Sequence, residues 1–117
     1  MQKVDKQTIR AVTPLSVLVK LVEFLDKGDG VDLDHLFDLT YCLARDRGIY
    51  LYDFHIDYEG NITSSGFWKD ITRMISWGYA QKASPNIKLT DAGKEFAGWL
   101  ILDAPIEAAL SKISCNP

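Results

Sequence analysis

The 117-residue sequence has few of the residues on which metal and thiol chemistry usually depend. It contains two cysteines and two histidines. Cys42 and Cys115 have neither CxxC spacing nor nearby histidines, so nothing in their pattern indicates a zinc site or a redox pair. We expect Cys42 to be a small buried residue within a helix. A disulfide with Cys115 stays open, although a cytosolic setting disfavours it.

Long apolar runs are also missing. The longest, residues 15–25, is interrupted by Ser16, Lys20 and Glu23 and falls short of the roughly 20 residues that span a bilayer. The N-terminus has no apolar segment followed by a small-residue cleavage site, which argues against a signal peptide. We therefore expect a cytoplasmic protein without membrane contact.

Catalytic and phosphate-binding motifs are absent as well. Neither GxGxxG nor GxxxxGK[ST] occurs, and G-x-S-x-G and H-E-x-x-H are missing. A calcium loop beginning at Asp26 fails because Gly28 and Gly30 stand where oxygen ligands are needed. These absences predict a protein that is not an enzyme and that uses no cofactor or metal.

One group has residue types suited to metal binding or acid–base chemistry, namely Asp53, His55 and Asp57. They alternate with apolar residues over residues 50–58, which predicts an extended strand with two distinct faces. Along such a strand the three side chains span roughly 13 Å and cannot converge on one ion. A solvated strand face is therefore the favoured interpretation, and a pH-sensitive contact between His55 and one aspartate stays open.

What the sequence does have is the composition of one soluble domain, with 47% hydrophobic and 25% charged residues. The net charge of −3 is divided unevenly. Residues 23–59 hold ten acids and three bases, whereas residues 60–94 hold two acids and five bases. The first 13 residues add Lys3, Lys6 and Arg10 against one acid. A polyanion would be attracted to the N-terminal segment and to residues 60–94, and repelled by residues 23–59.

Capping signals and apolar periodicity predict five helices and one β-hairpin. The helices are expected at residues 14–27, from Asp32 or Asp34 to Gly48, from one of Thr63, Ser64 and Ser65 to Gly78, at 90–102 and at 103–114, and the strands at 79–82 and 86–89. The run Gly28-Asp29-Gly30 is expected to end the first helix, because glycine can take the left-handed conformation of a C-cap.

The third predicted helix is amphipathic. Its apolar face is expected to contain Phe67, Ile71, Met74 and Ile75, and its polar face Lys69, Asp70, Thr72, Arg73 and Ser76. If this helix enters a DNA groove, the side chains that can point toward the bases are Lys69, Thr72, Arg73 and Ser76. Lys82 and Lys88 flank the predicted hairpin tip and would suit phosphate contacts.

These segments resemble a known family. The run Tyr52-Asp53-Phe54-His55-Ile56, the helix ending in Trp77-Gly78-Tyr79, and Leu89-Thr90-Asp91-Ala92-Gly93 together resemble prokaryotic winged helix-turn-helix domains. The resemblance implies a mainly α fold with a small β-hairpin wing, of the α+β class, and an extra C-terminal helix. In the ending L-T-x-x-G, the leucine would anchor a wing strand, the threonine would cap the next helix, and the glycine would allow close helix approach.

The resemblance implies a three-part organisation and a function. Residues 1–13 would be a flexible basic tail, residues 14–102 the winged-helix domain, and residues 103–117 a C-terminal helix and tail that could support dimerisation. We expect a homodimeric transcriptional regulator that binds double-stranded DNA. The dimer contacts would come from Trp99, Leu102, Ile106 and Leu110. Intramolecular packing of these residues stays open, as does a protein-interaction module or antitoxin-like partner that does not bind DNA.

Overall fold

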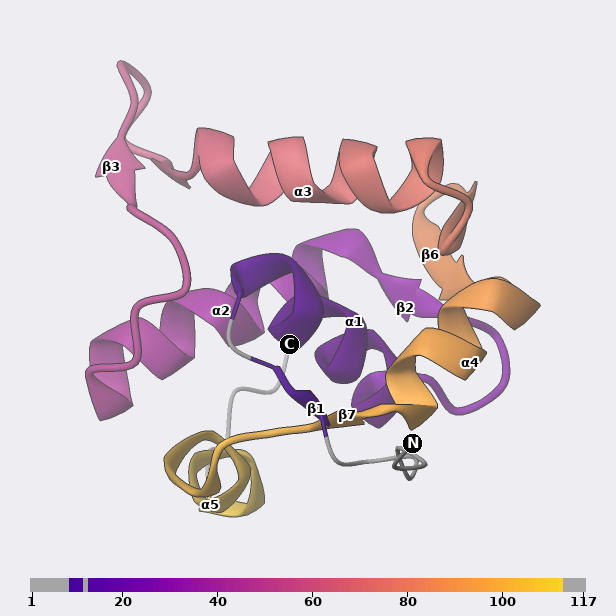
Figure 1. The fold of residues 1–117 in the computed structure, drawn as a ribbon. Coiled ribbons are helices and arrows are strands. Elements are labelled where there is room, and N and C mark those ends of the chain that lie inside the picture. The colour runs from indigo at the N-terminus through magenta and orange to yellow at the C-terminus, as the bar shows by residue number, and fades with distance from the viewer. Residues whose placement is uncertain (1–8, 12, 113–117) are drawn as a thin grey trace.

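The computed structural model describes residues 9–11 and 13–112, which form an α+β fold (Figure 1). The helices are α1 (Pro14–Leu25), α2 (Leu33–Arg47), α3 (Ser65–Ser76), α4 (Asp91–Gly98) and α5 (Ala104–Lys112). The strands are β1 (Ile9–Arg10), β2 (Val31–Asp32), β3 (His55–Ile56), β4 (Ile62–Thr63), β5 (Ala80–Ala83), β6 (Asn86–Leu89) and β7 (Leu100–Ile101). None of the helices in this part of the chain has the length and apolar character needed to cross a membrane.

The strands of the described residues form three small sheets. β6 lies between β2 and β5 and is antiparallel to both. β3 and β4 form a separate antiparallel hairpin, and β1 pairs with β7 in parallel. The β2–β6–β5 sheet therefore joins a strand that precedes α2 to a hairpin that follows α3.

Helix α1 lies at the centre of the molecule and packs against α2, α3, α4 and β6 (Figure 1). Leu18, Leu21 and Val22 are fully buried. The helix begins with a capping box, in which the hydroxyl of Thr13 accepts from the Ser16 N–H at 3.2 Å and the hydroxyl of Ser16 accepts from the Thr13 N–H at 3.1 Å. The predicted start and the broad apolar surface of this helix are confirmed.

The predicted end of α1 is wrong. The helix stops at Leu25, and its C-terminal cap is Asp26 in an extended conformation. The Asp26 carboxylate accepts hydrogen bonds from the backbone N–H groups of Gly28 and Gly30, at 2.7 and 3.0 Å. This side chain organises the following loop, so Gly28, although its φ is +125°, does not cap the helix.

The predicted bounds of α2 and α3 are confirmed. The Asp32 carboxylate caps α2 by accepting from two backbone N–H groups, and Gly48 ends that helix with a φ of +66°. Ser64 caps the start of α3, which ends at Ser76 with Trp77 as its C-terminal cap, and Gly78 follows with a φ of +80°. In each case a local side-chain bond or a left-handed glycine marks the boundary.

The extended segment predicted at residues 50–58 is largely wrong. Only His55–Ile56 forms a strand, because its single pairing partner is the two-residue strand β4. Tyr52 is buried, but Ile56 and Tyr58 from the same predicted apolar face are 66% and 109% exposed. The β3–β4 hairpin extends away from the helices (Figure 1), so the alternating pattern does not correspond to one buried face.

The helix predicted at residues 90–102 is shorter than expected. α4 ends at Gly98, and Leu100–Ile101 forms β7 instead. β7 pairs with β1, a segment almost the whole chain away, and the Ala11 N–H donates to the Ile101 carbonyl at 2.9 Å. Ala11 is itself buried. Part of the predicted N-terminal tail is therefore built into the fold, while residues 1–8 lie outside the described residues.

Candidate nucleic-acid interface and the pocket beside α3

Helix α3 separates its apolar and polar side chains into two faces. Phe67, Ile71 and Met74 are buried, and α3 packs against α1 and β5. The four predicted groove contacts Lys69, Thr72, Arg73 and Ser76 are exposed. Their spacing of three and four residues places them along one side of the helix. The structure therefore brings these four side chains together on one accessible surface.

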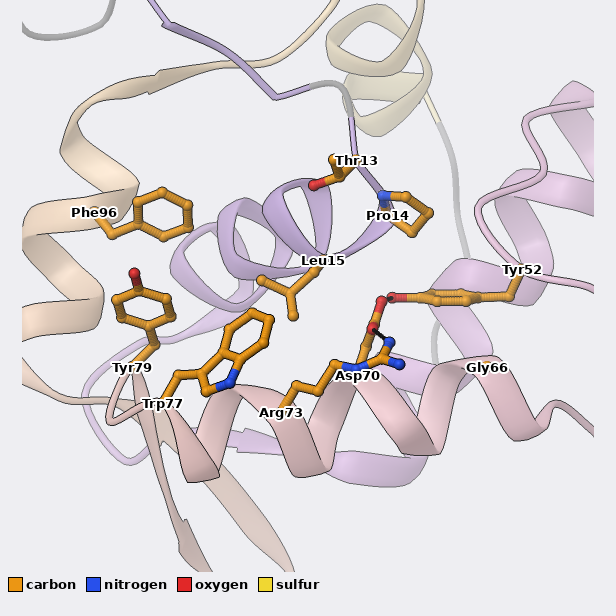
Figure 2. A pocket seen from close by; sticks show the side chains of 10 residues that line it. All are labelled: Thr13, Pro14, Leu15, Tyr52, Gly66, Asp70, Arg73, Trp77, Tyr79 and Phe96. Carbon is orange, nitrogen blue, oxygen red and sulfur yellow. Dashed lines mark hydrogen bonds and ion pairs between the residues drawn. The ribbon is translucent and has the colours of Figure 1, made fainter.

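Asp70 does not belong to that surface, contrary to the sequence-based expectation. It is only 6% exposed. Its Oδ2 accepts a hydrogen bond from the hydroxyl of Tyr52 at 2.7 Å, and its Oδ1 lies 2.9 Å from Arg73 Nη1 in an ion pair (Figure 2). Burial of the carboxylate is tolerated because both oxygens have partners. Of the two basic side chains on the exposed side of α3, Lys69 and Arg73, Arg73 is therefore paired with a carboxylate.

Tyr52 completes this buried network from outside the helix. It lies between α2 and the β3–β4 hairpin and contacts the Phe67 ring edge-on, with centroids 5.8 Å apart. Burial, followed by the hydrogen bond to Asp70 and the charge of that carboxylate, raises the pKa of the Tyr52 hydroxyl well above its usual range. Tyr52 is therefore a neutral donor at physiological pH and ties the segment before α3 to the helix.

The two hairpin lysines do not share a face. Lys82 is paired with Ile87, and Lys88 with Gln81, in the β5–β6 hairpin. Cross-strand partners project to the same side of a sheet and successive residues to opposite sides. Lys82 and Lys88 therefore project in opposite directions, so a duplex lying against one face of the hairpin meets only one of them directly.

The Asp53, His55 and Asp57 group is exposed and belongs to the β3–β4 hairpin region. Asp57 stabilises the local turn, because its carboxylate accepts hydrogen bonds from the backbone N–H groups of Glu59 and Asn61, both at 2.9 Å. Within residues 9–11 and 13–112 there is no group of three His, Cys, Asp or Glu side chains that could hold a metal ion. The arrangement of this region is that of a solvated turn.

A cavity of about 560 Å³ lies beside the exposed face of α3 (Figure 2). It is bounded by the first turn of α1, by α3, by the start of the β5 segment and by α4. Its lining residues are Thr13, Pro14, Leu15, Tyr52, Gly66, Asp70, Arg73, Trp77, Tyr79 and Phe96. Sequence reasoning missed this pocket because its walls come from distant segments. A local sign of the pocket in the sequence is the pair of aromatic residues Trp77 and Tyr79, which flank Gly78.

Some of the predicted dimer contacts are buried within the chain, and others are exposed. Ile106 and Leu110 of α5 are buried within the chain itself, whereas Trp99 is 40% exposed. Leu102 is half-buried against the core. The last helix therefore packs intramolecularly through Ile106 and Leu110, and a homodimer through the remaining exposed side chains stays a prediction.

Comparisons of the chain with protein-family models, with curated proteins and with solved structures find no match. The proposals below therefore rest on the fold and on the geometry of the surfaces just described.

Proposed function

We propose that this chain is a winged-helix protein that binds duplex DNA as a transcriptional regulator, with α3 as the recognition helix. The order α1, β2, α2, α3, β5 and β6 supports this proposal. The pairing of β2 with β6, next to the β5–β6 hairpin, supports it further. In this arrangement the β5–β6 hairpin is the wing.

The observation that carries the proposal is the exposed side of α3. Lys69, Thr72, Arg73 and Ser76 are accessible there, while the opposite side of the helix is packed into the core. A helix of this kind fits the major groove, where lysine and arginine bind guanine edges and threonine and serine bind several bases. One of the two hairpin lysines would then contact a backbone phosphate.

The connection between α2 and α3 distinguishes this chain from an ordinary helix-turn-helix. It comprises residues 48–64, with the β3–β4 hairpin inside it, instead of a turn of about 3–4 residues. The Tyr52–Asp70 hydrogen bond fastens the connection to the middle of α3. The proposed recognition helix is thus held in position by a buried bond from the segment that precedes it.

The proposal is tested by measuring the affinity for random-sequence duplex DNA at increasing salt. The logarithm of the binding constant should fall with the logarithm of the salt concentration, by about 0.9 for each phosphate contacted. Lys69→Glu combined with Arg73→Glu should abolish binding. Lys27→Glu combined with Arg47→Glu changes the net charge equally at exposed positions outside α3, and it should retain most of the affinity.

Two results would reject DNA binding through α3. One is the absence of any duplex binding in low-salt buffer. The other is an equal loss of affinity in the two charge-reversed variants, because that would show a response to net charge alone.

A second function, that of a protein-interaction module, is favoured by the β3–β4 hairpin. The hairpin extends away from the helices (Figure 1) and exposes the apolar side chains of Ile56 and Tyr58. Exposed apolar side chains on a projecting segment are typical of protein contacts. Under this proposal, a protein that co-purifies with the chain is lost after Ile56→Ser with Tyr58→Ser. It stays bound after Lys69→Glu with Arg73→Glu, and the opposite pattern would reject the hairpin as the contact.

A further inference from the structure

The pocket beside α3 has the size and the surfaces of a small-molecule site. Its volume of about 560 Å³ falls within the roughly 300–1,000 Å³ of known ligand pockets, which are mostly apolar with a few polar groups. We propose that it binds a planar aromatic molecule that carries an anionic group. This proposal does not rest on DNA binding and holds under either proposed function.

The aromatic side chains of the pocket favour a flat ligand. Tyr79 and Phe96 stack on one another with ring centroids 4.8 Å apart and an interplanar angle of 13°. Trp77, at the end of α3, is 60% exposed, and its indole faces the space beneath Leu15 (Figure 2). Among residues 9–11 and 13–112 no ring stacks on this indole, so it offers a surface on which an aromatic molecule can stack at a centroid distance of about 4.5–7 Å.

The polar end of the pocket offers hydrogen-bond donors and a positive charge. Arg73 has a half-exposed side chain, and one of its N–H groups donates to Asp70. Within the described residues its other N–H groups have no partner in the protein. A guanidinium has five N–H donors and no acceptor, so most of its bonding capacity remains available.

The nearby carboxylate of Asp70 and hydroxyl of Tyr52 do not cancel the attraction of Arg73 for an anionic ligand. Asp70 is almost fully buried, with its two oxygens bonded to Tyr52 and Arg73. The Tyr52 hydroxyl already donates its proton to Asp70 and is not free to donate to a ligand. A ligand therefore meets the accessible guanidinium of Arg73 more directly than it meets the carboxylate, which selects an anion over a cation.

The experiment uses the full-length protein and three probes: 1-naphthoate, the cation 1-naphthylmethylammonium, and the non-planar anion cyclohexanecarboxylate. Two-dimensional ¹H–¹⁵N NMR resolves the indole N–H signals of the three tryptophans, Trp68, Trp77 and Trp99. We expect 1-naphthoate to shift the Trp77 signal saturably and the other two signals much less. Each of the other two probes should bind at least about tenfold more weakly, since one lacks the charge-assisted bond and the other the stacking.

Variants separate this pocket from other apolar surfaces. Trp77→Ala should weaken 1-naphthoate binding by about tenfold, whereas Phe24→Ala, at another exposed aromatic residue outside the pocket, should leave it unchanged. Arg73→Gln should remove most of the preference for 1-naphthoate over the cation, with circular dichroism confirming that each variant is folded.

The proposal is overturned if 1-naphthoate gives no saturable shift of the Trp77 signal at millimolar concentration. It is also overturned if the cation binds as tightly as the anion, or if a folded Arg73→Gln variant keeps the original preference. None of these outcomes depends on whether the protein binds DNA.

Discussion

The hydrogen bond between Tyr52 and Asp70 should be a measurable part of the stability of the protein. Tyr52→Phe removes the hydroxyl that donates to Asp70 at 2.7 Å and keeps the ring against Phe67. Because Asp70 is only 6% exposed, water cannot easily replace the lost donor. The variant therefore tests whether the hydrogen bond between the segment before α3 and the helix contributes to the free energy of unfolding.

The expected cost follows from the environment of the carboxylate. A hydrogen bond to a charged group contributes about 1.5–3 kcal/mol, and Arg73 remains as a partner at 2.9 Å. We expect Tyr52→Phe to lower the free energy of unfolding by about 2 kcal/mol. Tyr50→Phe removes a hydroxyl from a residue that is 71% exposed, so it should change stability by less than about 0.5 kcal/mol.

The same bond predicts a dependence on alkaline pH. The pKa of Tyr52 is raised in the folded state, so above a pH of about 10 an unfolded tyrosine releases its proton while the folded one retains it. The unfolded state then binds fewer protons, and stability falls as pH rises, by up to about 1.4 kcal/mol per pH unit for this group. Below pH 10 both states are protonated and this contribution is constant.

Urea denaturation followed by circular dichroism, at pH 7 and between pH 10 and 11, measures both effects. Tyr52→Phe should be less stable than the parent at pH 7, and its stability should decline less steeply above pH 10. The reasoning is refuted if Tyr52→Phe and Tyr50→Phe are equally stable at pH 7, or if removing the Tyr52 hydroxyl leaves the alkaline decline unchanged.

Two further substitutions test local features of the fold. Gly93→Ala places a Cβ 1.9 Å from the Tyr79 carbonyl oxygen, whereas Gly98→Ala in the same helix meets nothing within 4 Å. Gly93→Ala should therefore lower the free energy of unfolding by about 2–3 kcal/mol through overpacking. Gly98→Ala should leave that free energy unchanged or raise it. Equal effects of the two substitutions in urea denaturation would contradict the close contact at Gly93. Asp32→Ala removes the cap of α2 and should lower stability by about 1 kcal/mol, whereas Asp32→Asn, which can still cap, should restore most of that loss.

The features that the sequence predicted correctly depend on neighbours along the chain. Asp32, Ser64 and Thr90 each accept a hydrogen bond from a backbone N–H within three residues, so the cap and the start of its helix are encoded together. Gly93 also has the role expected from the L-T-x-x-G ending, because its backbone lies against Tyr79 where no Cβ fits. Local hydrogen bonding and sterics are sufficient to predict such positions.

The features that sequence reasoning missed depend on distant partners. Asp70 stands at a polar position of α3, and one of the two partners that make its burial favourable is the hydroxyl of Tyr52, 18 positions earlier. Leu100–Ile101 continues an apolar helical pattern, but pairing with β1 makes it a strand. The pocket beside α3 likewise appears only when α1, α3 and α4 are brought together. Periodicity cannot reveal these contacts because each partner alone looks ordinary.

Arg73 belongs both to the exposed side of α3 and to the wall of the pocket. A DNA phosphate or base and an aromatic anion would therefore draw on one guanidinium, which cannot serve both fully. Thermodynamic linkage requires the effect to be mutual: any factor by which an aromatic anion weakens DNA binding is the factor by which DNA weakens binding of that anion. If both proposals hold, a single side chain makes this small domain a sensor in which the two ligands oppose one another.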